Sequence, residues 1–288
     1  MSRNNGRNTI RVATWNVNGV RARLATVSEW LRDTAPDVVC LQEIKTEEKN
    51  FPAEAFEDLG YNLAIHGQKG FNGVAILSRH PIDEVRRGLP TWPDEEQARY
   101  IEAVVSTETG ALRVASVYAP NGNPVNTEKF DYKLRWLEAF HAHAADLLKL
   151  EERFALGGDY NIIPTPRDAK NPEEWEGDAL FSPQARAAWR KLINLGLVDA
   201  ALACKGDPRQ FTFWDYKGGA WQKNDGIRID FVLLSPQAAD AMVDAGTDKR
   251  VRAWEKPSDH VPLLVELDPR HQGMFMQPPF SAAAAGGK

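Results

Sequence analysis

The sequence has few cysteines, no long apolar run and no internal repeat, and each absence excludes a class of protein. It contains only 2 cysteines, and Cys40 stands inside an apolar run, so we expect no disulfide framework. No stretch approaches the roughly 20 apolar residues that a membrane span needs. The first residues are polar and unlike a secretory signal, which favours a reducing, cytoplasmic setting.

The composition is that of an ordinary folded protein. Charged residues make up 26% of the chain and hydrophobic residues 43%, which argues against disorder and fibrous repeats. The formal net charge of -5 argues mildly against a protein that coats nucleic acid. A local basic rim beside an acidic site remains compatible with that charge.

Nothing in the interior marks a domain boundary, because no linker rich in Gly, Ser or Pro interrupts the chain. We therefore expect a single catalytic domain over residues 9–268. Residues 1–8 are expected to be a flexible N-terminus, and residues 269–288 a disordered tail, because neither carries a periodic apolar pattern. A monomer is the expected state.

Short β-branched runs alternate with amphipathic segments along this domain. Several runs follow one another without a helix between them, so a purely parallel, doubly wound sheet does not fit. The pattern favours two sheets rich in antiparallel pairs, with helices outside. The predicted strands are residues 10–15, 38–42, 61–66, 74–78, 101–107, 112–118, 154–158, 229–234 and 262–267, and the predicted helices are residues 21–34, 128–150 and 183–195.

Polar side chains stand at the ends of these predicted strands, where α/β sheets gather ligand-binding groups on a rigid base. Taken singly, each segment also fits a turn, a cap or a solvated charge. Taken together, they place carboxylates, amides, a phenol and an imidazole at one type of position. The segments are 15–19 (WNVNG), 42–43 (QE), 118–122 (YAPNG), 157–161 (GGDYN), 228–230 (RID) and 258–260 (SDH).

In order and approximate spacing, these six segments resemble the motif set of the exonuclease III family, within the endonuclease/exonuclease/phosphatase superfamily. The resemblance runs from residue 10 to about residue 267. It implies an α/β (α+β) fold, a four-layered α/β sandwich of two packed mixed β-sheets flanked by helices. It also implies a DNA-repair phosphodiesterase that cuts the backbone 5′ to abasic sites and removes 3′ nucleotides or blocking groups.

The resemblance assigns roles to the matched residues. Asp159 is implied as the group that orients or deprotonates the attacking water, and His260, with Asp230 as its partner, as a contact to the scissile phosphate. An Asp–His pair of this kind keeps the imidazole charged at neutral pH. The implied catalytic residues are Asp159, Asn161, His260, Asp230 and Tyr118; the metal-binding residues are Glu43, Asn16 and Asp259; Asn18 and Asn121 contact phosphate.

The implied chemistry needs a hard divalent cation. Phosphodiester hydrolysis requires that negative charge be neutralised, and carboxylate and amide oxygens are the ligands that Mg²⁺ takes. We therefore expect Mg²⁺ as the cofactor, with Mn²⁺ as a substitute. Which group removes the proton from water, and whether one or two ions act, stay open at this point.

Loop residues must determine the substrate specificity, because lipid and inositol phosphatases share the same metal core. Residues 67–73 resemble a DNA-contacting loop and supply Lys69 and Asn72, and Arg99 is a candidate for a phosphate-tracking rim. Two later segments match those that form an apolar pocket for a sugar without its base. The pocket residues implied in this way are Phe213, Trp214, Ile227 and Ile229.

The expected partner is double-stranded DNA that contains abasic sites or 3′ ends. Ile227 stands where some relatives have tryptophan, which leaves the balance between abasic-site cutting and 3′-exonuclease activity open. One alternative is a sphingomyelinase-like or inositol-phosphatase-like esterase on the same fold. Another is a catalytically inactive nucleic-acid-binding regulator, which the full set of acidic and imidazole groups disfavours.

Overall fold

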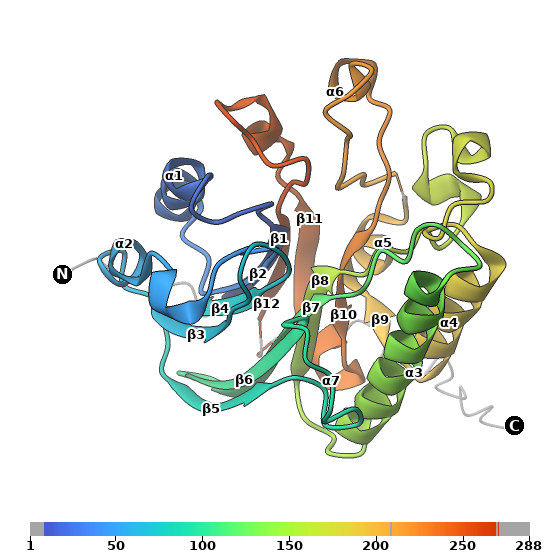
Figure 1. The fold of residues 1–288 in the computed structure, drawn as a ribbon. Helices are drawn as coiled ribbons and strands as arrows, with labels where there is room; N and C mark the ends of the chain where they lie inside the picture. Colours follow the sequence, from blue (N-terminus) through green and yellow to red (C-terminus); the bar gives the residue numbers. More distant parts are fainter. Residues whose placement is uncertain (1–8, 208, 269, 271–288) are drawn as a thin grey trace, which may run out of the picture.

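The computed structural model describes residues 9–207, 209–268 and 270 (Figure 1). The predicted flexible N-terminus, residues 1–8, and all of the predicted tail except residue 270 lie outside the described residues. Within the described residues, no helix has both the length and the apolar character needed to cross a membrane.

Among the described residues, twelve strands form two mixed sheets of six strands each. The first sheet has the order β11-β12-β1-β2-β4-β3, and the second has the order β5-β6-β7-β8-β10-β9. The strands of the first sheet are β1 (Ile10–Asn16), β2 (Val38–Gln42), β3 (Asn62–His66), β4 (Val74–Ser78), β11 (Met242–Thr247) and β12 (Leu263–Leu267). Those of the second are β5 (Ile82–Arg87), β6 (Tyr100–Thr107), β7 (Gly110–Tyr118), β8 (Phe154–Asp159), β9 (Val198–Asp199) and β10 (Asp230–Leu234).

Each sheet is built around one parallel pair. β1 pairs with β2 in parallel, and β7 pairs with β8 in parallel, while the other pairs are antiparallel. Since both strands of a parallel pair end at the same edge, residues that follow β1 and β2 come together, as do those that follow β7 and β8. The central strands are buried on both faces, which matches their continuous apolar runs.

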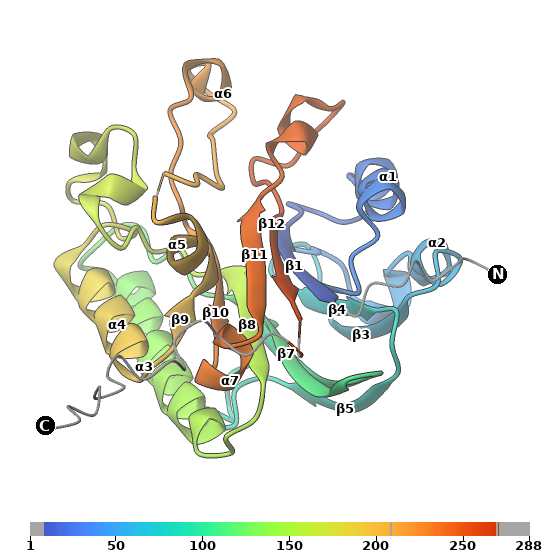
Figure 2. The ribbon, with the colours of Figure 1, turned by 180° about the vertical axis from the view of Figure 1, so that it is seen from behind.

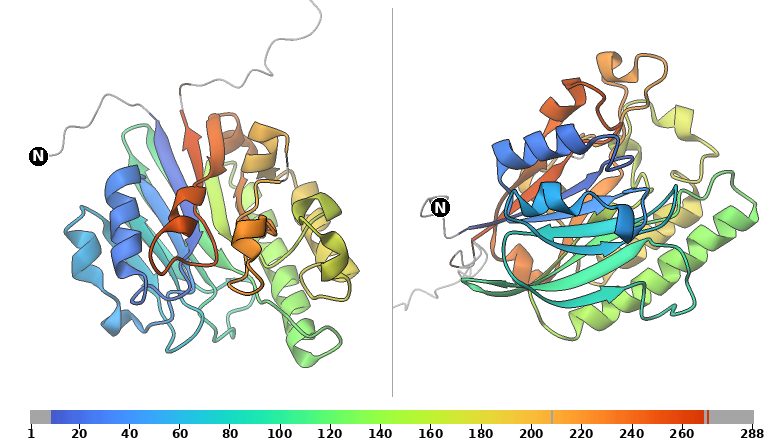
Figure 3. Two further views of the ribbon diagram at one scale, coloured as in Figure 1. Left: turned by 90° about the horizontal axis from the view of Figure 1, so that it is seen from above. Right: turned by 60° about the vertical axis from the view of Figure 1, so that its left-hand side comes forward.

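The sheets pack face to face, and helices cover their outer faces, so the molecule has four layers (Figures 1 and 3). Helices α1 (Leu24–Thr34) and α2 (Ala53–Glu57) lie on the first sheet, and α3 (Glu128–Leu148) and α4 (Pro183–Asn194) lie on the second. This confirms the fold class that the sequence predicts. The remaining helices are α5 (Ala200–Lys205), α6 (Ala220–Lys223) and α7 (Pro236–Ala239), with 3-10 turns η1 (Glu48–Asn50), η2 (Pro166–Asp168), η3 (Pro172–Trp175) and η4 (Lys249–Ala253).

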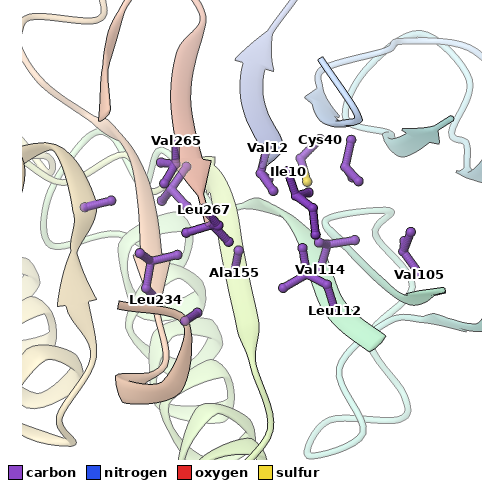
Figure 4. Packing of buried hydrophobic residues seen from close by; sticks show 14 of the residues in the cluster. Ile10, Val12, Cys40, Val105, Leu112, Val114, Ala155, Leu234, Val265 and Leu267 are labelled. Atoms are coloured by element: carbon purple, nitrogen blue, oxygen red, sulfur yellow. The ribbon is translucent and has the colours of Figure 1, made fainter. Parts of the chain in front are cut away.

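The core between the sheets consists of small and branched apolar side chains. Val12 and Cys40 of the first sheet face Val114 and Ala155 of the second, all of them buried (Figure 4). Each fully buried aliphatic side chain contributes roughly 1.5–3 kcal/mol relative to an exposed one. This packing fixes the distance between the sheets and therefore the positions of the groups at their ends.

Three long connections extend beyond one end of the sheets: the segments around η2 and η3, around α6, and around η4 (Figures 1 and 2). They come from positions far apart in the sequence and surround the same end of the sandwich. At this end β1, β7 and β8 finish and β10 begins. The polar segments found in the sequence lie there.

Candidate active site

The strand register brings acidic and phenolic groups side by side. Tyr118 is paired with Asp159 across β7 and β8, and Asp230 is paired with Asp159 across β10 and β8. The close approach of β8 to β7 needs glycine, because a Cβ at Gly158 would lie 2.0 Å from the backbone oxygen of Val117. Gly158 therefore lets β8 approach β7 closely, which places Asp159 beside Tyr118.

Asn16 links the two sheets at this end. Its Nδ2 donates to Glu43 Oε1 at 2.9 Å and to Asp159 Oδ2 at 2.9 Å. Its own oxygen accepts the backbone N–H of Asn18 at 3.0 Å, so the amide turns its nitrogen toward the carboxylates. Asn16 thus bridges Glu43 and Asp159, and its role as a metal ligand stays a prediction.

Glu43 is held from several sides. The Tyr118 hydroxyl donates to its Oε1 at 2.9 Å, and the ammonium of Lys45 lies 2.8 Å from its Oε2. Burial alone would raise the pKa of Glu43, but the hydrogen bond from Asn16 and the charge of Lys45 lower that pKa below its usual range. Glu43 also has a left-handed backbone (φ +50), a conformation that costs on the order of 1–3 kcal/mol for a residue with a side chain. Such strain is typical of functional positions.

A second branch of contacts reaches the loop before β12. Lys45 Nζ donates to Asn18 Oδ1 at 2.6 Å, and Asn18 Nδ2 donates to Asp259 Oδ1 at 3.1 Å. Asp259 and Asn18 therefore belong to the same network as Glu43. Sequence reasoning missed Lys45, although a lysine two residues after a strand-end carboxylate is a signal for an ion pair of this kind.

His260 completes the centre of the site. Its Nδ1 lies 2.8 Å from Asp230 Oδ2, and its Nε2 lies 3.8 Å from Asp159 Oδ2. Burial alone would lower the pKa of His260, but the carboxylates of Asp230, Asp159 and Asp259 raise it to about 10. His260 is therefore an imidazolium at neutral pH, as the predicted Asp–His pair requires.

The site carries more negative than positive charge. Burial raises the pKa of Asp159 to about 7; His260 opposes the rise, and the neighbouring charges of Asp230 and Glu43 add to it. The second oxygen of Asp230, Oδ1, is buried and has no hydrogen-bond partner among the described residues. A buried carboxylate oxygen without a partner is costly unless a cation compensates it.

These groups fit a divalent metal ion. Asp159, Asp230 and His260 each offer one ligand atom, and these atoms lie within 4.8 Å of one another. A protonated imidazole has no lone pair for a metal, so the oxygen atoms are the available donors. An excess of carboxylate oxygens is the ligand set that hard divalent cations take.

Two asparagines lie at the open side of this centre. Asn161 donates from its backbone N–H to Asp159 Oδ1 at 2.9 Å and from its Nδ2 to the backbone oxygen of Ala119 at 2.9 Å. Asn121 Nδ2 donates to Asn161 Oδ1 at 3.4 Å, and Asn121 is exposed. The exposed Asn121 amide can therefore reach a phosphate that enters the site, whereas the Asn161 amide is buried and held between Ala119 and Asn121.

The predicted DNA-contacting residues lie in different surroundings. Lys69 is exposed on the loop, whereas Asn72 is buried and donates to Gln68 and Gln97, which holds the loop in place. Arg99 stacks over the ring of Tyr118, with 5.0 Å between the guanidinium carbon and the ring centroid. The structure thus brings Arg99 to the site and gives Asn72 a structural contact.

Three of the four predicted pocket residues form one apolar cluster. Phe213, Ile227 and Ile229 pack together, and the Phe213 ring centroid lies 5.0 Å from that of His260. Trp214 is fully buried and packs with the core under α1 instead. Phe213 and Ile227 also line a cavity of about 280 Å³ with Trp175, a residue that sequence reasoning missed because it stands alone in a polar segment.

Comparisons with known proteins agree with this geometry. Residues 13–260 match the model of the Endonuclease/Exonuclease/phosphatase family. The chain is 36% identical over 270 residues to exodeoxyribonuclease III of Haemophilus influenzae, which covers 90% of this chain and 100% of that protein. It is 28% identical over 264 residues to the DNA repair nuclease APEX1 of Danio rerio, covering 90% and 82% of the two chains.

Solved structures show the same fold. An AP endonuclease from Archaeoglobus fulgidus superposes with a TM-score of 0.85 at 36% identity, covering 90% of this chain and 99% of that one. The 3′ phosphatase NExo from Neisseria, bound to a product DNA hairpin, superposes with a TM-score of 0.86 at 38% identity and the same coverage. This chain belongs to the endonuclease/exonuclease/phosphatase family, in its exodeoxyribonuclease III branch.

Proposed function

We propose that this protein hydrolyses the DNA backbone 5′ to abasic sites and removes 3′ nucleotides or blocking groups. The observation that carries the proposal is the continuous chain of contacts from Glu43 through Asn16 and Asp159 to His260 and Asp230. It joins both sheets and has an excess of carboxylate oxygens at its centre. The exodeoxyribonuclease III and AP endonuclease relatives support a phosphodiesterase that acts on DNA.

We assign the metal to the acidic side of the site. Glu43, whose pKa is lowered, and Asp259, which is joined to it through Asn18 and Lys45, would hold a Mg²⁺ ion, with Mn²⁺ as a substitute. When bound, such an ion neutralises phosphate charge and assists the departure of the leaving oxygen. The carboxylate oxygens of Glu43 and Asp259 are the donors that a hard cation takes.

His260, Asp159 and Tyr118 have separate roles in the proposed reaction. His260, kept positive by Asp230, donates a charge-assisted hydrogen bond to a phosphate oxygen. Asp159 accepts the proton of the attacking water, and its pKa of about 7 suits a general base near neutral pH. Tyr118 acts as a donor, because burial and the charges of Glu43 and Asp159 raise its pKa well above the ordinary value.

The apolar cluster selects the substrate by shape. Phe213 stands beside His260, and Ile227 and Ile229 form the wall behind it. A sugar without its base can enter such a slot, whereas an intact nucleotide is too large. Asn121, Asn161, Asn18, Lys69 and Arg99 would contact the phosphates along the strand.

We further propose that the protein acts as a monomer on double-stranded DNA in a reducing compartment, the cytoplasm. Both cysteines are free: Cys40 is buried in the core and Cys204 is half-buried. Burial raises the pKa of the Cys40 thiol to about 12, so it remains an inert core residue.

A gel assay tests this function. The substrates are a duplex with one abasic site, a nicked duplex and a duplex with a recessed 3′ end, each incubated with Mg²⁺. We expect a cut on the 5′ side of the lesion that leaves a 3′-hydroxyl, shown by extension with a polymerase, and complete loss of cutting with a chelator. His260→Ala should lower kcat about 10²–10⁴-fold, because it removes a charged group at the phosphate.

The matched control is His141→Ala, which changes a histidine on α3 outside the site and should leave kcat unchanged. Cleavage of a phospholipid or inositol phosphate without cleavage of abasic DNA would favour the esterase alternative. Full activity in the presence of the chelator would overturn the metal-assisted mechanism.

A further inference from the structure

Lys133 is a fully buried lysine beneath the phosphate-facing side of the site. It lies on α3, a helix whose other inward residues are apolar or aromatic side chains and a histidine. Its side chain points at the loops that follow β7 and β8 and not at solvent. A charged side chain is almost never fully buried unless specific partners hold it.

The ammonium of Lys133 has three partners, all of them backbone oxygens. Nζ donates to the carbonyl of Asn121 at 3.0 Å, that of Asn161 at 2.6 Å and that of Ala179 at 3.1 Å. An ammonium group has three N–H donors, so these acceptors use all of them. One side chain thereby ties together three segments that are far apart in the sequence.

Two of these three segments, the one after β7 and the one around Ala179, are joined a second time beside Lys133. Asn123 Nδ2 donates to both carboxylate oxygens of Asp178 at 3.1 Å, and Asn123 Oδ1 accepts the backbone N–H of Ala179 at 2.9 Å. Gly122 packs directly on the lysine stem, since a Cβ there would lie 2.5 Å from Cδ of Lys133. The loop after β7 is thus shaped around this one side chain.

Two of the three carbonyls that Lys133 contacts belong to Asn121 and Asn161, the asparagines proposed above to contact phosphate. Asn161 has a left-handed backbone (φ +49), and its amide lies between Ala119 and Asn121. A small rotation of either backbone would move an amide group away from the phosphate. The contacts of Lys133 with these carbonyls therefore affect where the amides of Asn121 and Asn161 lie.

We propose that Lys133 is a positioning residue for phosphodiester hydrolysis, which fixes the amides of Asn121 and Asn161 toward the phosphate through their main-chain carbonyls. This inference rests on the proposed function. An apolar side chain would serve better if the position needed only packing, because burial lowers the pKa of Lys133 to about 7 and only Asp178 and Asp159 oppose that shift. The three carbonyl acceptors account for a hydrogen-bond donor at this position.

The first test compares Lys133→Met with Lys129→Met, a matched change at an exposed position of the same helix. Methionine fills the volume of the lysine stem and donates no hydrogen bond. We expect Lys133→Met to lower kcat on the abasic duplex about 10- to 100-fold, the effect of a misplaced group, with KM nearly unchanged. Lys129→Met should leave both parameters unchanged.

A double-mutant cycle separates positioning from general destabilisation. Because Lys133 is proposed to act through both asparagines, adding Lys133→Met to the Asn121→Ala/Asn161→Ala variant should lower kcat no further than that variant alone. Multiplicative losses would overturn the proposal. If Lys133→Met does not fold, as judged by circular dichroism, Lys133→Gln, which keeps two N–H donors, takes its place in the cycle.

The side-chain amide signals of Asn121 and Asn161 in NMR spectra test the positioning without any turnover. They should shift or broaden in Lys133→Met and stay in place in Lys129→Met. If the wild type cuts DNA, then unchanged amide signals or an unchanged kcat in Lys133→Met would overturn the role of Lys133 and leave the proposed function intact. Failure of the wild type to cut any DNA substrate would instead overturn the proposed function.

Discussion

Two buried carboxylates in this protein, Asp159 and Glu102, have pKa values that are shifted in opposite directions. Glu102, on β6 beneath α3, accepts the hydroxyl of Tyr100 at 2.6 Å and lies 2.7 Å from Nε2 of His143 and 3.4 Å from Arg113. Burial alone would raise the pKa of Glu102, but these neighbours lower it below its ordinary value. Asp159 is equally buried, yet its pKa is raised to about 7.

The difference teaches how to tell a structural buried charge from a functional one. Around Glu102 the donors satisfy the carboxylate, so the cluster is complete and stabilises the packing of α3 on its sheet. Around Asp159 further carboxylates crowd together, and Asp230 Oδ1 has no partner among the described residues. An incomplete cluster of this kind costs stability and is retained where a ligand completes it.

The largest expected effect is on catalysis at Asp159. Asp159→Asn should lower kcat about 10²–10⁴-fold, because an amide cannot accept the proton of water. Its melting temperature should fall less than that of Glu102→Ala, because the change relieves repulsion from Asp230 and Glu43 while it weakens the contacts with His260 and Asn16. Steady-state kinetics and thermal unfolding of the same preparation check both parts, and a melting temperature below that of Glu102→Ala would contradict the comparison.

The reverse pattern is expected at Glu102. Glu102→Ala should lower the free energy of unfolding by about 3 kcal/mol, because it leaves Tyr100, His143 and Arg113 without their shared acceptor. Urea denaturation measures this loss, and kcat per folded molecule should match the wild type. A kcat loss as large as that of Asp159→Asn would show that the Glu102 cluster is not merely structural.

Mg²⁺ should stabilise the folded protein through Glu43 and not through Glu102. A Mg²⁺ concentration 100-fold above its dissociation constant should raise the free energy of unfolding by about 2.7 kcal/mol. Glu43→Gln should lose this stabilisation, whereas Glu102→Gln should keep it, as measured by thermal unfolding across a Mg²⁺ series. Equal stabilisation of both variants would place the ion elsewhere.

The smallest expected effect is a pH dependence of stability from Glu102. Because its folded pKa lies below the unfolded value of 4.5, its contribution is present above pH 4.5 and is lost as the pH falls through the folded pKa. The difference in free energy of unfolding between wild type and Glu102→Gln should therefore shrink as the pH falls below 4.5. Urea denaturation at a series of pH values from neutral to acid measures it, and a constant difference would contradict the assignment.

Sequence patterns predicted the buried strands well and the edge strands poorly. β2 and β4 have the predicted bounds, because both faces of these strands are buried and their apolar runs are continuous. β5, β9 and β11 were missed. β5 is an exposed, charged edge strand, β9 has two residues, and the register of β11 shifts between Met242 and Asp244, so none carries a clear apolar alternation.

The positions of site residues that stand at strand ends could be predicted from the sequence. The positions of residues that depend on the direction of a side chain could not. Glu43, Asp159 and His260 come together as expected because parallel and antiparallel registers carry them to one edge. Trp214 was grouped with Phe213, but neighbouring residues in extended backbone point to opposite sides, and only Phe213 reaches the pocket. Lys133 was missed because its role depends on backbone carbonyls, which leave no pattern in the sequence.

The pairing of β1 with β12, residue 10 opposite residue 267, affects when a newly made chain becomes able to cut DNA. Asn16 and Glu43 leave the ribosome early, while Asp259 and His260 arrive only with the strand that closes the first sheet. The site is therefore complete only when β12 has paired with β1, and a chain that stops before residue 259 lacks both of these groups.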